Sequence, residues 1–72
     1  MIGEGMKVQF VPAFLESKVL TPEERRDFTH TGTVTYINWE HRMFWVEFEA
    51  GGTKQREAFQ FYDIGKQVKV IG

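Results

Sequence analysis

The chain has 72 residues, 42% of them hydrophobic, which suits one core and a single domain over residues 1–72. It has no cysteine, which excludes a disulfide framework, a thiolate nucleophile and a zinc site built on sulfur. A formal net charge of -1 argues against nucleic acid as the default partner, and no apolar run approaches the roughly 20 residues of a membrane-spanning helix.

The first predicted element is a strand over residues 6–11. Its alternation places Val8 and Phe10 on one face, and Pro12, which lacks an amide donor, ends the pairing or confines it to an edge. The segment from Phe14 to Leu20 fits no strict alternation. Two interpretations stay open for it, a strand or an apolar loop packed on the sheet.

A short helix is predicted next, at about residues 22–28. Thr21 can cap it, Pro22 suits its first position, and Glu24 stands where a capping box needs a carboxylate. The helix cannot run far, because residues 29–32 continue a helix poorly and a β pattern follows at once.

From Gly32 onward the pattern is β, with four strands predicted at residues 33–38, 43–49, 54–61 and 68–71. Gly51-Gly52 suits a two-residue hairpin turn, because glycine accepts the positive φ angles that such turns need. This turn sets the register of the hairpin and pairs charges on one face and aromatic residues on the other. The predicted partners are Glu49 with Lys54, Glu47 with Arg56, Trp45 with Ala58 and Phe44 with Phe59.

The preceding hairpin leaves two alternatives. A three-residue turn at residues 39–41 places Val34 opposite Val46 and Tyr36 opposite Phe44, and a two-residue turn at residues 40–41 is its rival. After the fourth strand, residues 62–65 are too few for an α-helix and predict one 3₁₀ turn. The last short strand then closes the sheet.

This order of elements resembles the Src-homology-3-like barrel, an all-β fold of five strands with a long first loop and a 3₁₀ turn before the last strand. Parts of the sequence also resemble small uncharacterised proteins of bacterial phages and prophages: Tyr36-Ile37-Asn38, His41-Arg42, Phe44, Val46-Glu47-Phe48 and Arg56-Glu57 with Phe59. The resemblance implies a phage or mobile-element origin and transfers no activity, cofactor or catalytic residue. The proline-binding motifs of signalling Src-homology-3 domains are not recognisable in the long loop.

The titratable residues do not predict catalysis. His30 and His41 lie in predicted loops without a partner nucleophile or a water-excluding pocket, and Glu47 and Glu49 have cationic neighbours. Alternation points Glu57 inward beside Val46, so we expect its carboxylate at a rim or bound to backbone donors, unless a bulge near Arg56 turns it away. We therefore expect no enzyme, no cofactor and no metal site.

The most informative set of side chains faces outward. If Phe44, Val46 and Phe48 point into the core, Met43 and Trp45 point out, with Ile37 and Trp39 beside them. In one interpretation the loop over residues 11–31 covers these side chains, using Phe14, Leu15, Leu20 and Phe28. In the other they form a protein-binding surface consisting of Ile37, Trp39, His41, Arg42, Met43 and Trp45.

A small nucleic-acid-binding barrel is the alternative function. It uses the same aromatic side chains for base stacking and takes Arg42, Arg56, Lys54 and Lys69 for phosphates. Glutamates interleave with these cations, which ranks this function behind protein binding. Residues 1–6 lack the basic start and apolar run of a secretion signal, so the expected location is the cytoplasm.

Overall fold

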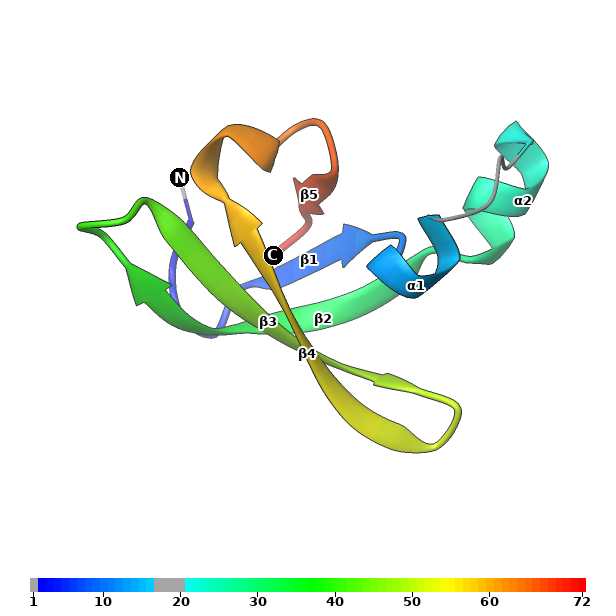
Figure 1. The fold of residues 1–72 in the computed structure, drawn as a ribbon, viewed down its shortest axis with the longest axis horizontal. Helices are drawn as coiled ribbons and strands as arrows, with labels where there is room; N and C mark the ends of the chain where they lie inside the picture. Colours follow the sequence, from blue (N-terminus) through cyan, green and yellow to red (C-terminus); the bar gives the residue numbers. More distant parts are fainter. Residues whose placement is uncertain (1, 17–20) are drawn as a thin grey trace.

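A computed structural model describes residues 2–16 and 21–72 of the protein. Its elements in chain order are β1 (Lys7–Phe10), α1 (Ala13–Glu16), α2 (Pro22–Asp27), β2 (His30–Asn38), β3 (Met43–Ala50), β4 (Thr53–Gln60), the 3₁₀ helix η1 (Phe61–Asp63) and β5 (Val68–Val70). The two short α-helices lie at one end of the sheet, beside the start of β2 (Figure 1). Among the described residues, no helix has the length and apolar character to cross a membrane.

The five strands form one antiparallel sheet in the order β4-β3-β2-β1-β5, so the predicted all-β class is confirmed. The predicted closure of the sheet is wrong. β4 and β5 lie at its two edges, and β5 is only three residues long and pairs with β1. The chain leaves β4 through η1, and beyond it Ile64 forms an isolated parallel bridge with Val68.

One face of the sheet carries the core. Val8 and Phe10 of β1 are buried on it as predicted, and β3 alternates as predicted between buried and more exposed positions. Aromatic rings fill the centre, where the Phe10 ring centroid lies 4.9 Å from that of Phe48 and 5.2 Å from that of Phe59. The buried cluster consists of Ile2, Val8, Phe10, Val34, Ile37, Phe44, Val46, Phe48, Phe59 and Val68.

The predicted helix after Thr21 is confirmed together with its capping box. The Thr21 hydroxyl accepts a hydrogen bond from the Glu24 amide at 3.2 Å, and the Glu24 carboxylate accepts one from the Thr21 amide at 3.0 Å. Before it, residues 13–16 form α1, so neither predicted alternative, strand or loop, is correct for them. The rest of that predicted segment, residues 17–20, lies outside the described residues.

The β3–β4 hairpin has the predicted register throughout, from Phe44 opposite Phe59 to Glu49 opposite Lys54. Gly51 and Gly52 form its turn with φ angles of 61° and 76°, the left-handed region that glycine adopts without strain. The ion pair is diagonal, because Lys54 Nζ lies 3.7 Å from Glu47 Oε1. The Arg56 guanidinium lies instead over the Trp45 ring, 6.0 Å from its centroid.

The β2–β3 pairing contains a bulge between Val34 and Tyr36. Val34 lies opposite Val46, as the three-residue turn predicted, but Tyr36 lies opposite Trp45 and not opposite Phe44. On the turn side of the bulge the register is that of the rival two-residue turn. The extra residue, Thr35, shifts the pairing by one position, so each alternative holds for one part of the hairpin.

Candidate functional site

The structure divides the predicted protein-binding residues into three groups. Ile37 is only 7% exposed and belongs to the core, so its predicted outward orientation is wrong. The bulge at Thr35 reverses the alternation of the residues that follow it, which turns Ile37 inward and Tyr36 outward. Met43 and Trp45 lie on the outer face of β3, and Trp39, His41 and Arg42 lie in the β2–β3 loop.

The outer face of the sheet carries a short row of paired residues across three strands. Tyr36 of β2 lies opposite Trp45 of β3, which lies opposite Ala58 of β4. Tyr36 is 51% exposed and Trp45 is 38% exposed. Together with Arg56, which lies over the Trp45 ring, this row forms a mixed aromatic and cationic surface.

A concave site adjoins the β2–β3 loop. It has a volume of about 630 Å³ and is bordered by His41, Arg42, Gln60, Phe61 and Tyr62. We call this site the loop hollow. Trp39 stands next to it, because its ring packs edge to face on Phe61 at a centroid distance of 5.4 Å. The Trp39 side chain is 56% exposed and that of Tyr62 is 72% exposed, so both present aromatic surface to solvent.

Local interactions shape the loop hollow. The Asn38 side-chain oxygen accepts a hydrogen bond from the His41 amide at 3.0 Å, a turn-forming contact typical of asparagine. Arg42 follows with a φ of 53°, in the left-handed region. Its carbonyl accepts a hydrogen bond from the Phe61 amide at 2.9 Å, which joins the β2–β3 loop to η1.

The exposure of the two tryptophans favours the open over the covered interpretation of this surface. Trp39 and Trp45 both reach solvent, so the described part of the long loop does not bury them. Of the predicted covering residues, Phe14 is itself exposed, whereas Leu15 and Phe28 are partly buried. Leu20 lies outside the described residues.

Sequence reasoning missed Phe61 and Tyr62 as site residues, although a signal for them existed. Extending the predicted hairpin register by one pair places Gln60 opposite Met43, as the structure shows. The next residues along each strand are Phe61 and Arg42, so the register already brings η1 to the β2–β3 loop.

His30 and Glu57 both have backbone partners. His30 Nδ1 donates a hydrogen bond to the Phe28 carbonyl at 2.8 Å. Glu57 accepts one from the Ala13 amide at 2.9 Å, which confirms the expected bond to a backbone donor and excludes a bulge at Arg56, since the register there is regular. Within residues 2–16 and 21–72, no cluster of three or more His, Cys, Asp or Glu side chains could hold a metal ion.

Comparisons of this chain with protein-family models, with curated proteins and with solved structures found no match.

Proposed function

We propose that the protein is a non-enzymatic interaction module that holds a segment of another protein in the loop hollow. The main observation in support is one concave site where the β2–β3 loop and η1 come together and where aromatic rings are exposed. The loop contributes His41 and Arg42, with Trp39 beside them, and η1 contributes Phe61 and Tyr62. Trp, Tyr and Arg are the residue types enriched at the energetic centres of protein interfaces.

Preorganisation supports this assignment. The Phe61 amide donates a hydrogen bond to the Arg42 carbonyl, and the Phe61 ring packs on Trp39. The centroid of the Phe61 ring also lies 6.3 Å from that of the buried Phe44 ring. The aromatic side of the loop hollow is therefore packed against the core through Phe61. Because the site is already ordered, little conformational entropy is lost at Phe61 when a partner binds, which favours binding.

The border of the loop hollow indicates the chemistry of the bound segment. Its surface is mainly aromatic, and its charged border residue is the exposed Arg42, with His41 beside it and no carboxylate among the bordering residues. An apolar side chain can pack against Phe61 and Tyr62 while a neighbouring carboxylate pairs with Arg42. We therefore assign as partner a protein segment with an apolar anchor next to an acidic residue.

We assign the fold as an open variant of the Src-homology-3-like barrel. The antiparallel order β4-β3-β2-β1-β5, the long connection after β1 and the 3₁₀ turn before β5 support this assignment. An accessory role in a phage or prophage accords with the sequence resemblance over residues 36–59. A small non-enzymatic module that engages another protein suits such a role.

Selection from a displayed random-peptide library on the immobilised protein tests the proposal. We expect enriched peptides that combine an apolar side chain with an acidic neighbour. Their affinity, measured by fluorescence anisotropy, should fall at least about tenfold in Tyr62→Ala, equivalent to roughly 1.4 kcal/mol. Arg42→Asn should cause a similar loss, since Asn tolerates the left-handed conformation of this position but lacks the charge.

The matched control is Trp45→Ala, which removes a large aromatic side chain from the outer face of β3 and leaves the loop hollow intact. It should keep the affinity within about twofold of the unchanged protein. A library that yields no binder, or binders that tolerate Tyr62→Ala and depend on Trp45, would contradict the proposal.

A further inference from the structure

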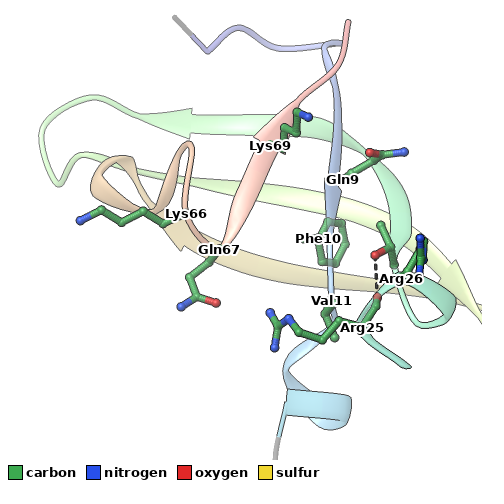
Figure 2. A pocket seen from close by; sticks show the side chains of 9 residues that line it. Gln9, Phe10, Val11, Arg25, Arg26, Lys66, Gln67 and Lys69 are labelled. Atoms are coloured by element: carbon green, nitrogen blue, oxygen red, sulfur yellow. Dashed lines mark hydrogen bonds between the residues drawn. The ribbon is translucent and has the colours of Figure 1, made fainter. Parts of the chain in front are cut away.

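A second hollow, of about 340 Å³, lies between β1, the segment that leads into β5 and the C-terminal end of α2. It shares no residue with the loop hollow. Phe10 and Val11 are buried at its base, and four cationic side chains surround it: Arg25, Arg26, Lys66 and Lys69 (Figure 2). We call this site the basic hollow.

The fold brings these cations together from distant parts of the chain. β5 pairs with β1 so that Lys69 lies opposite Gln9, and β1 pairs with the start of β2, directly after α2. The Thr29 hydroxyl donates to the Arg25 carbonyl at 2.8 Å and fixes the end of α2. Basic residues in a last helical turn also suit the helix dipole, but that effect does not account for Lys66 and Lys69.

The charged residues that line the basic hollow are all cationic. Its lining includes four of the nine Lys and Arg residues of the chain and no carboxylate, although the net charge of the protein is -1. Because screening limits charge interactions to about 8–10 Å at physiological salt, this local surplus acts on a bound anion more than the net charge does.

The arrangement of the side chains indicates the kind of anion. The charged ends lie around the hollow and do not converge on one point, as Figure 2 shows. A ligand that contacts all four cations must therefore carry several separated anionic groups. Gln9 and Gln67 add carboxamide groups, which commonly donate to phosphate and sugar oxygens.

We propose that the basic hollow binds successive backbone phosphates of a nucleic acid without reading base sequence. Phe10 and Val11 are both buried, hence neither offers a face for base stacking. An acidic protein segment is the weaker candidate, because the lining has no exposed aromatic or aliphatic side chain to receive an apolar anchor.

Fluorescence anisotropy with a labelled oligothymidylate of about 12 nucleotides, and with a duplex of equal length, tests this site between roughly 50 and 200 mM salt. We expect similar binding of oligonucleotides of different sequence. Because four cations meet phosphates, the slope of log affinity against log salt should be about -3. Lys66→Gln/Lys69→Gln should weaken binding at least about tenfold at low salt and reduce that slope by about 1.5.

Lys54→Gln/Arg56→Gln is the matched control, since it removes the same charge from exposed positions of β4. It should keep the affinity within about twofold. Three results would overturn the proposal: no binding at about 50 mM salt, an equal loss in the control pair, or polyglutamate that competes as well as the unlabelled oligonucleotide. The second would place the phosphates on the outer face, and the third would assign the site to acidic proteins.

Discussion

Phe44→Ala should lower the free energy of unfolding by roughly 3 to 5 kcal/mol, measured by urea denaturation followed by tryptophan fluorescence. Phe44 is fully buried, and its ring contacts those of Phe59 and Phe61 at centroid distances of 5.8 and 6.3 Å. Truncation removes this apolar surface and leaves a cavity in the core beside Phe59 and Phe61. A domain of 72 residues has a total stability of only about 4 to 11 kcal/mol, so the loss is a large share of it.

Phe14→Ala is the matched control, because Phe14 is an exposed phenylalanine of the same size in α1. It should cost under about 1 kcal/mol. Phe44→Leu, with an intermediate loss of about 1 to 2 kcal/mol, keeps the comparison measurable if the alanine variant is unfolded. Equal losses for Phe44→Ala and Phe14→Ala would contradict the placement of the core.

Gly32→Ala should destabilise the fold by roughly 2 to 3 kcal/mol, measured as the shift in the urea midpoint at constant slope. Gly32 is buried in β2, where a Cβ atom would collide with Cγ1 of Val46 and lie 2.9 Å from the Glu47 carbonyl oxygen. The Phe10 ring would be 3.1 Å away. The neighbouring strand and the Phe10 ring must move to make room for one methyl group. These shifts are the reason for the expected loss of stability.

Combining Gly32→Ala with Val46→Ala sharpens this test. Val46→Ala alone should cost roughly 2 to 3 kcal/mol, but in the double variant it removes the atom nearest to the new methyl group. The combined loss should therefore be about 1 kcal/mol smaller than the sum of the single losses. Gly72→Ala, at an open position, should be neutral. A harmless Gly32→Ala would show that β2 and β3 do not pack as closely as described.

Two parts of the fold could be predicted from sequence because local chemistry determines them. Gly51-Gly52 accepts the positive φ angles of a tight turn, and this turn sets every pair of the β3–β4 hairpin. The helix after Thr21 begins where threonine, proline and glutamate satisfy the first free amide groups. Neither feature depends on residues far away in the chain.

The bulge in β2 could not be predicted in this way, because it depends on tertiary packing. Strict alternation after Val34 buries Tyr36 and exposes Ile37, whereas the bulge at Thr35 buries Ile37 and leaves Tyr36 51% exposed. Burial of the wholly apolar side chain is favourable, and a phenol at the surface keeps its hydrogen bonds to solvent. The same shift removed one residue from the predicted site and added Tyr36 to the outer face.

Only the part of the candidate site that lies in the β2–β3 loop was predicted from the sequence. Trp39, His41 and Arg42 are neighbours in sequence, so their proximity follows from the chain itself. Phe61 and Tyr62 reach the same hollow through the pairing of Met43 with Gln60. α1 escaped prediction for a different reason, since four residues are too few to display a helical period.

The side-chain indole signals of Trp39 and Trp45 in a ¹H–¹⁵N NMR titration test the central claim most directly, because they are the only two tryptophans of the chain. Trp39 packs beside the loop hollow, and Trp45 lies on the outer face of β3. A library-selected acidic peptide should shift the Trp39 signal and leave the Trp45 signal in place. A titration that moves the Trp45 signal alone would contradict binding in the loop hollow.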